Sequence, residues 1–257
     1  MSSADGAVHL QLRGAVATIT FDRPSARNAM TWAMYEQLDE ELDRIDASRD
    51  VRVVVLRGAG GHFVAGTDIA QFTAFTSGDD GVAYESRLER IVAKLEQMRA
   101  ATIAGVEGFA VGAGLVLAAA CDLRIAAPSA RFGVPIARTV GNALSMMNYA
   151  RLVALLGASR TKAMLLTTDF MPADEARAAG FVAAVVDESA FGPELDALSA
   201  RVSTYSPITI QCTKEAVRRI VEVAQGDDLV HRAYGSRDFH EGVAAFVEKR
   251  APKWEGR

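Results

Sequence analysis

Two short apolar segments of the chain, Val51–Leu56 and Thr102–Val106, each lead through a glycine-rich turn toward a helical pattern. Val51–Leu56 is apolar except for Arg52, which is typical of a strand buried in a parallel sheet. Strands alternate with helices throughout the first half of the chain. This alternation predicts an α/β fold with a largely parallel sheet.

The rest of the chain divides into a core and a helical region. Further strands are predicted at Val8–Leu12, Val16–Phe21, Leu123–Ala126 and near Val182–Val186, and helices at Thr31–Ser48, Val82–Met98 and Leu115–Ala120. From about Ala143 the pattern is helix after helix, which predicts a helical layer over the sheet. A soft boundary near Pro207 separates a core, residues 1–206, from a C-terminal helical region, residues 207–257.

Composition excludes several classes of protein. Half of the residues are hydrophobic and 23% are charged, so the chain can bury a sizeable core. A net charge of −4 without a dense basic run argues against a nucleic-acid surface. Cys121 and Cys212 are too few for a disulfide scaffold and suit a reducing compartment. With no signal pattern and no apolar run long enough to cross a bilayer, we expect a soluble, cytoplasmic protein.

Familiar catalytic and cofactor motifs are missing from the sequence. Gly112-Ala113-Gly114 begins like a dinucleotide fingerprint, but Leu117 occupies the place of the third glycine. There is no phosphate-binding loop and no Gly-x-Ser-x-Gly elbow. The four histidines, His9, His62, His231 and His240, lack the spacing of metal ligands, so no metal site is expected. Cys121 lies in an apolar stretch and is interpreted as a buried filler.

Two strand-to-helix turns remain as candidates for function, His62–Ile69 and Gly108–Gly114. Each joins a buried strand to a helix through small residues, which leaves backbone N–H groups at the helix start without intrahelical partners. Such groups can bind a developing negative charge, and two that converge on a carbonyl oxygen form an oxyanion hole. Tight packing of a helix on a sheet also calls for small residues, so either turn alone supports both interpretations.

Taken in order, these turns and several other segments resemble the crotonase (enoyl-CoA hydratase/isomerase) superfamily over nearly the whole chain. The similar segments are Phe21–Pro24, Arg27–Met30, Phe63–Ile69, Gly108–Gly114, Cys121–Arg124, Arg131–Pro135 and Glu241–Arg250. The resemblance implies a crotonase-like spiral of β-β-α turns followed by a C-terminal helical layer. It also implies homo-oligomers, trimers or dimers of trimers, with residues 207–257 as the trimerisation region.

The resemblance further implies an acyl-CoA thioester as substrate, with coenzyme A present only as part of that substrate. The backbone N–H groups of Thr67 and Ala113 would polarise the thioester carbonyl. The residues implied in binding the substrate are Arg27, Ala65, Gly66, Asp68, Ile69, Ala70 and Gly112, together with Phe246 and Lys249, which could reach coenzyme A on a neighbouring subunit.

The chain departs from the family at the two glutamates that handle protons in a hydratase. The resemblance places these glutamates at Val116 and Ile136, and both residues are aliphatic. The nearest polar residues in the sequence are Arg138, Thr139, Asn142 and Ser145. Arg138 could clamp a substrate carboxylate or pair with a surface acid, and Asn142 or Ser145 could position a water. Asp68 and Asp122 are interpreted as structural, and Glu107 as facing solvent.

Three functions are consistent with this pattern. The first is an enzyme of lyase or isomerase type that stabilises a thioester enolate, as in fatty acid metabolism, with weak standard hydratase activity. The second is a catalytically weak paralogue that binds acyl-CoA, and the third is an assembly subunit. The acyl pocket is expected between Val82–Met98 and the helices after Gly141, and the sequence does not name the acyl group.

Overall fold

The computed structural model describes residues 6–75, 78–222, 237, 241, 248 and 250–257. Its main sheet has six strands in the spatial order β1-β2-β3-β4-β6-β9. Their bounds are Ala7–Arg13 (β1), Val16–Asp22 (β2), Val53–Gly58 (β3), Ala101–Val106 (β4), Leu123–Ala126 (β6) and Ala184–Val185 (β9). β1 and β2 form an antiparallel hairpin, and every other neighbouring pair is parallel. The predicted parallel sheet is therefore confirmed.

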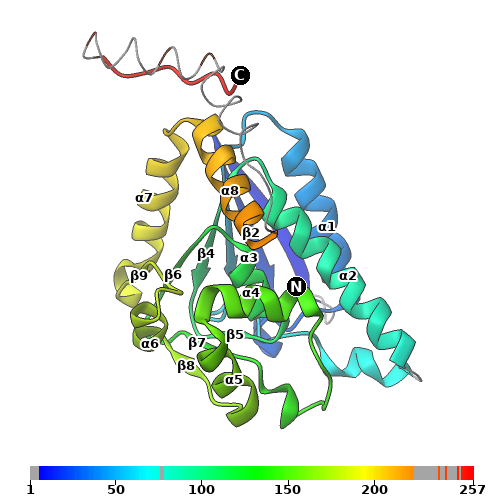
Figure 1. The fold of residues 1–257 in the computed structure, drawn as a ribbon. Coiled ribbons are helices and arrows are strands. Elements are labelled where there is room, and N and C mark those ends of the chain that lie inside the picture. Colours follow the sequence, from blue (N-terminus) through cyan, green and yellow to red (C-terminus); the bar gives the residue numbers. More distant parts are fainter. Residues whose placement is uncertain (1–5, 76–77, 223–236, 238–240, 242–247, 249) are drawn as a thin grey trace.

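A second, smaller sheet of three strands lies beside the first (Figure 1). It contains β5 (Phe109–Val111), β7 (Arg131–Gly133) and β8 (Met171–Pro172). This sheet was not expected from the sequence, because strands of two or three residues are too short to show an alternating pattern. The omission matters, since β5 leads directly into one of the two candidate turns.

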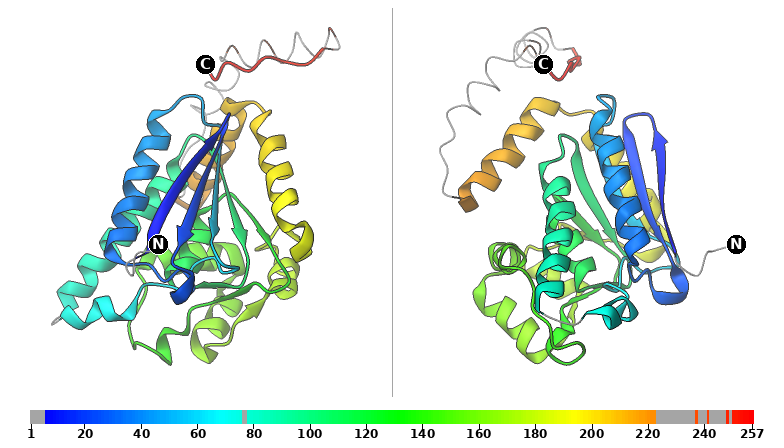
Figure 2. Two further views of the ribbon diagram at one scale, coloured as in Figure 1. Left: turned by 180° about the vertical axis from the view of Figure 1, so that it is seen from behind. Right: turned by 90° about the vertical axis from the view of Figure 1, so that its right-hand side faces the viewer.

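Helices surround the sheet on both faces (Figures 1 and 2). The α-helices are α1 (Trp32–Ala47), α2 (Gly78–Gln97), α3 (Ala113–Ala120), α4 (Met146–Leu156), α5 (Ala158–Thr167), α6 (Ala173–Ala178), α7 (Phe191–Ser203) and α8 (Pro207–Glu222). Short 3-10 helices are η1 (Pro24–Ala26), η2 (Ile69–Ala74), η3 (Pro135–Ala137) and η4 (Glu188–Ala190). Along β3, Val54 and Leu56 belong to one hydrophobic cluster and Val53 and Val55 to another, because successive side chains point to opposite faces. The strand is thus buried on both sides, as predicted.

Helix α1 forms as its sequence predicts. The Thr31 hydroxyl accepts a hydrogen bond from the Met34 N–H at 3.3 Å and so caps the first turn. Met34, Leu38, Leu42 and Ile45 are buried on one face of the helix. That face packs in the same cluster as α2 and α3, which carry the site described below.

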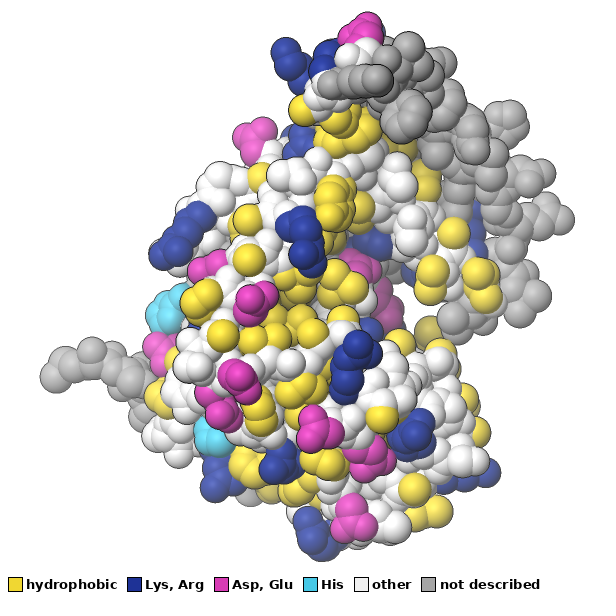
Figure 3. All heavy atoms as spheres, turned by 90° about the vertical axis from the view of Figure 1, so that its left-hand side faces the viewer, with side chains coloured by type: hydrophobic (Ala, Val, Ile, Leu, Met, Phe, Trp, Pro, Cys, Tyr) yellow, Lys and Arg dark blue, Asp and Glu magenta, His cyan; other side chains and the backbone are white. Residues whose placement is uncertain are grey.

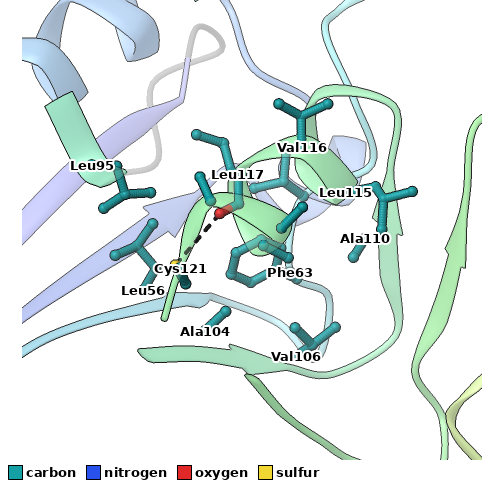
Figure 4. Packing of buried hydrophobic residues seen from close by; sticks show 14 of the residues in the cluster. Leu56, Phe63, Leu95, Ala104, Val106, Ala110, Leu115, Val116, Leu117 and Cys121 are labelled. Carbon is teal, nitrogen blue, oxygen red and sulfur yellow. Dashed lines mark hydrogen bonds between the residues drawn. The ribbon is translucent and has the colours of Figure 1, made fainter. Parts of the chain in front are cut away.

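Helix α3 is buried along its whole length, and its residues pack against Phe63, Leu56 and Leu95 (Figure 4). Arg124 secures the C-terminal end of this helix: its guanidinium donates to the carbonyl oxygens of Ala118 at 3.1 Å and Cys121. These acceptors lie in the last turn of the helix, where carbonyls lack i+4 donors, although the Ala118 carbonyl also accepts from Cys121 N–H at 3.3 Å. The C-terminal end of α3 is thereby tied to β6.

Helix α8 begins at Pro207, where the sequence analysis placed its soft boundary. It is attached to the core by Lys214, whose ammonium lies 2.7 Å from Asp122 and donates to the carbonyl oxygen of Ala100 at 2.9 Å. The division into a core and a trimerisation region stays a prediction. Most of residues 223–249 lie outside the described part of the chain.

Candidate functional site

The two candidate turns lie side by side. Val64 and Ala110 form a parallel bridge, in which Val64 N–H donates to Phe109 and Val111 N–H donates to Val64, both at 2.9 Å. Beyond this bridge, a Cβ on Gly112 would lie 3.8 Å from the Cα of Gly66. The segments that lead to Thr67 and Ala113 are therefore in van der Waals contact.

The backbone N–H groups of Thr67 and Ala113 are left available by this geometry. Thr67 and Met30 form a parallel bridge whose hydrogen bonds involve the residues on either side of Thr67. Met30 N–H donates to the Gly66 carbonyl, and Asp68 N–H donates to the Met30 carbonyl. In a parallel bridge this directs the Thr67 N–H away from Met30. Ala113 is the first residue of α3, so its N–H has no intrahelical acceptor. Among the described residues, no carbonyl or side-chain oxygen accepts from either amide.

Two glycines make this arrangement possible. Gly112 has a φ of 55°, in the region that favours glycine, and turns the chain between β5 and α3. At Gly114 a Cβ would lie 2.0 Å from the carbonyl oxygen of Val64, so any side chain would separate the two turns. The small residues therefore serve close packing as well as the exposure of the amides.

The Thr67 side chain is held by two tyrosine hydroxyls. Its Oγ1 lies 2.6 Å from the Tyr35 hydroxyl and 2.7 Å from the Tyr84 hydroxyl. Burial raises the pKa of both tyrosines, and the negative charge of nearby Glu85 raises them further. Both phenols are therefore neutral near pH 7 and fix the Thr67 turn from the side of α1 and α2.

The predicted coenzyme A segment, Ala65–Ala70, is exposed only at its C-terminal end, beside the turns. Ala65 is partly buried and Gly66 buried, whereas Ala70 is exposed and Ile69 is 56% exposed. The Asp68 carboxylate accepts from Ala70 N–H at 3.1 Å and pairs with Arg23 at 2.8 Å, so its side chain is structural, as interpreted.

Arg27 lies at the same edge. It has a left-handed φ of 52°, and its carbonyl accepts from Ala65 N–H at 3.0 Å. The exposed guanidinium sits 4.9 Å from the centroid of the Phe109 ring. Burial lowers the pKa of His62, and the positive charge of Arg27 lowers it further. A cation is thus fixed beside the backbone segment predicted to receive coenzyme A.

The two aliphatic residues at the implied glutamate positions differ in their surroundings. Val116 is 1% exposed and packs within the main hydrophobic cluster (Figure 4). Ile136 is partly buried in η3 and packs against the same cluster. Neither position offers a proton-transferring group.

A cavity of about 710 Å³ opens between α2 and the segment before α4. Its lining is Phe72, Phe75, Gly78, Gly81, Val82, Tyr84, Glu85, Ser86, Glu89, Val140, Asn142, Ala143, Leu144 and Ser145. This is the region in which the acyl pocket was expected. Tyr84 connects it to the turns, since the ring lines the cavity and the hydroxyl contacts Thr67.

Glu85 lies in this region and was not among the residues expected from the sequence. Its carboxylate lines the cavity and accepts from Ser145 N–H at 2.7 Å. A signal was present in the sequence, because Glu85 is three residues before Leu88 and seven before Val92, at the spacing of the buried stripe of α2. A carboxylate on an apolar stripe is unusual and can mark a site.

Other polar residues near the turns have structural roles or face solvent. Asp122 accepts from the N–H and hydroxyl of Thr102, as its structural interpretation predicts. Glu107 lies 3.9 Å from Arg57 and outside the cavity lining. Arg138 is exposed and forms no ion pair with another described residue. Burial raises the pKa of Cys121 to about 12, which agrees with a buried filler.

Further predictions concern metals, membranes and the C-terminal segment. Within residues 6–75 and 78–222 and the few described beyond them, no group of three or more potential metal ligands occurs. No helix in that part of the chain is long and apolar enough to cross a membrane. The sequence also argued against a basic nucleic-acid surface. On the face that carries α7, cationic and anionic side chains are interspersed (Figure 3). Phe246 and Lys249 lie outside the described residues.

Comparison with known proteins gives matches along the whole chain. A family model described as enoyl-CoA hydratase/isomerase matches residues 11–257. A probable enoyl-CoA hydratase of Mycobacterium tuberculosis is 33% identical over 248 residues, which cover 94% of this chain and 95% of that protein. The 2,3-dehydroadipyl-CoA hydratase of Escherichia coli is 32% identical, over 94% of this chain and 96% of that protein.

A solved structure shares the architecture described above. The enoyl-CoA hydratase/carnithine racemase from Magnetospirillum magneticum superimposes with a TM-score of 0.91 at 30% identity, covering 100% of this chain and 99% of that one. The predicted crotonase-like α/β fold is therefore confirmed. By sequence and by fold, this chain belongs to the enoyl-CoA hydratase/isomerase family of the crotonase superfamily.

Proposed function

We propose that this protein is an enzyme that binds an acyl-CoA thioester and stabilises its enolate with the N–H groups of Thr67 and Ala113. The observation that carries the proposal is the contact between two turns whose amides have no acceptor among the described residues. Ala113 is buried and Thr67 partly buried, so N–H groups without acceptors at both positions are suited to an oxygen that arrives with a ligand.

The surroundings of the two amides fit such a substrate. The cavity beside Thr67 has an aromatic and aliphatic lining suited to an acyl chain. The exposed edge at Ile69 and Ala70, with the Arg27 guanidinium beside it, offers backbone groups and a cation to the polar part of coenzyme A. Coenzyme A would enter and leave as part of the substrate.

A comparison of two ligands tests this proposal. Butyryl-CoA and S-butyl-CoA, a thioether, share the coenzyme and a four-carbon tail, but only butyryl-CoA has a carbonyl oxygen. Two hydrogen bonds of about 1 kcal/mol each predict that the thioester binds about tenfold or more tightly. Isothermal titration calorimetry measures both affinities. Equal affinities would show that the carbonyl is not recognised, and no binding of either ligand would refute the proposal.

A second candidate is favoured by Val116 and Ile136. An acyl-CoA-binding paralogue with weak turnover would keep the two amides and the cavity while lacking both implied glutamates. The two candidates share the binding site and differ in proton transfer. They are therefore separated by whether any other residue of the cavity exchanges protons with a bound thioester.

We also propose a homo-oligomer, a trimer or a dimer of trimers. Support comes from large hydrophobic side chains on the surface, among them Met146, which is 80% exposed, and Val217 and Ile220 on α8. Contact with another copy would bury them. Sedimentation velocity at micromolar concentration should give a trimer or hexamer, whereas a stable monomer would contradict the proposal. The cytoplasmic location remains a prediction.

A further inference from the structure

The cavity holds two carboxylates with different partners, Glu85 and Glu89. Glu89 accepts from the buried guanidinium of Arg151 at 2.7 Å, and Arg151 also pairs with Glu96 at 2.6 Å. Burial lowers the pKa of Arg151, but these bonds raise it by more, and they give Glu89 and Glu96 a shared cationic partner. Glu85 has no ion pair with any described residue. Of the two carboxylates in the cavity, Glu85 is therefore the one without a cationic partner among the described residues.

The carboxyl group of Glu85 is held in place by α4. Its Oε2 accepts from Ser145 N–H at 2.7 Å, and Ser145 is the N-cap residue of that helix. The side-chain amide of Asn148 is also near, and its buried Nδ2 has no hydrogen-bond partner in the described part of the chain. Donors at the start of a helix can support a carboxylate without neutralising it.

Burial raises the pKa of the Glu85 carboxyl above its usual value, and the charge of Glu89 raises it further. The Ser145 N–H and the Asn148 amide act in the opposite direction. The titratable groups around the Glu85 carboxyl are Glu89 and Tyr84 on the same helix, Tyr35 on α1 and Arg151 on α4. Helix α3 contributes only apolar side chains. A carboxylate that is partly desolvated and lacks a counterion is a stronger base than one in water.

Glu85 is linked to the Thr67 turn through the residue before it. The preceding residue, Tyr84, contacts the Thr67 side chain, and the charge of Glu85 acts on both tyrosines that hold Thr67. An acyl chain whose carbonyl oxygen reached the amides and whose tail entered the cavity would pass the Glu85 carboxylate. The carbon next to the carbonyl would be the first atom of the tail.

We infer that Glu85 is the proton-transferring residue of this protein, in the place of the two missing glutamates, and that its substrate class is an acyl-CoA with α-hydrogens. The inference rests on the proposed function, because it uses the two amides. The carboxylate removes an α-proton, the C–H electron pair forms the Cα–C1 double bond, and the carbonyl π electrons move to the oxygen held by Thr67 and Ala113. Return of a solvent-derived proton to Cα gives exchange, and with a 3-enoyl thioester return of the proton to Cγ of the dienolate gives the 2-enoyl isomer.

The experiment must distinguish the proposed role of Glu85 as a base from a purely structural role. As an acceptor for Ser145 N–H, Glu85 also ties α2 to the start of α4. Glu85→Gln keeps an oxygen acceptor of the same length and removes the base. A carboxyl whose folded pKa is raised stabilises the fold only when protonated, and this contribution is lost as pH rises through that pKa. At pH 7 the charged form therefore costs stability, so Glu85→Gln should unfold at an equal or higher temperature.

The experiment is deuterium incorporation at Cα of butyryl-CoA in heavy water, followed by mass spectrometry on the full-length protein. The native protein should exchange, and its rate should fall as pH drops through a midpoint above 4.5, the ordinary value for Glu. Glu85→Gln should lose at least about a hundredfold in rate and the pH inflection, with a Kd for butyryl-CoA within threefold of native. Glu85→Asp should retain part of the rate.

Glu40→Gln, the same change on an exposed face of α1, is the matched control and should exchange like the native protein. Native exchange that persists in Glu85→Gln, or binding without native exchange, would overturn the role of Glu85 while leaving the binding site intact. Absence of butyryl-CoA binding by the native protein would overturn the proposed function, and this inference with it.

Discussion

Ala113→Pro is expected to lower turnover of a bound acyl-CoA by about a thousandfold. Proline has no N–H, and its ring carbon would occupy the space into which the Ala113 N–H points. Loss of one oxyanion donor alone costs about a hundred- to thousandfold in rate. Deuterium exchange at Cα of butyryl-CoA measures the loss, together with turnover of any acyl-CoA that the native protein converts.

The position of Ala113 makes this variant easier to interpret than most proline substitutions. Ala113 is the first residue of α3, where proline is tolerated because the N–H there has no intrahelical partner. Ala113→Gly, which keeps the N–H, is the matched control and should remain active. If Ala113→Pro folds with a native circular dichroism spectrum and keeps activity within tenfold, the oxyanion-binding amides are elsewhere.

Hydration of crotonyl-CoA by the native protein is expected to be about a hundred- to ten-thousandfold slower than by a hydratase with two glutamates, because Glu85 can serve as only one of the two proton-transferring groups. Adding water requires one group to take a proton from water and another to give one to Cα, and each typically supplies about a hundred- to ten-thousandfold. Val116 and Ile136 can do neither. Loss of absorbance of the enoyl thioester measures the rate, and a native rate within tenfold of the two-glutamate enzyme would contradict the expectation.

Replacing these residues by glutamates tests the same point by gain of function. The Val116→Glu, Ile136→Glu double variant should gain measurable hydration if the backbone keeps hydratase geometry. Val116 is buried among apolar side chains, so a glutamate there would have a raised pKa and lower the free energy of unfolding. Ile136→Glu alone, at a partly exposed position, is the control for stability. Unchanged hydration in a folded double variant would place the reacting water elsewhere.

Long apolar patterns predicted the fold well, whereas short strands and long-range contacts could not be predicted from such patterns. The run at Val51–Leu56 and the stripe on α1 specify buried faces by themselves, so a buried strand and helix were predicted, although the strand lies two residues later, at Val53–Gly58. The three residues of Phe109–Val111 become a strand only because they pair with Arg131–Gly133, a contact that no local pattern encodes. The smaller sheet therefore had to be found in the structure.

The site shows the same division. The small residues around Thr67 and Ala113 indicated free amides, but the residues alone fitted tight packing equally well. The bridge between Val64 and Ala110, far apart in sequence, is what brings the two turns together. Glu85 fell on a readable apolar stripe, yet its lack of a counterion depends on Arg151 pairing with its neighbours Glu89 and Glu96 instead.

The most direct test of the account is the vibrational spectrum of a bound thioester. Hydrogen bonds from two fixed amides weaken the carbonyl bond and lower its stretching frequency. Infrared difference spectra of butyryl-CoA labelled with carbon-13 at the carbonyl isolate that single band. We predict that saturation of the native protein moves the band below its position in water, and that Ala113→Pro removes most of the shift. A band that stays at its solution position in the saturated native complex would contradict the central claim that Thr67 and Ala113 polarise the thioester carbonyl.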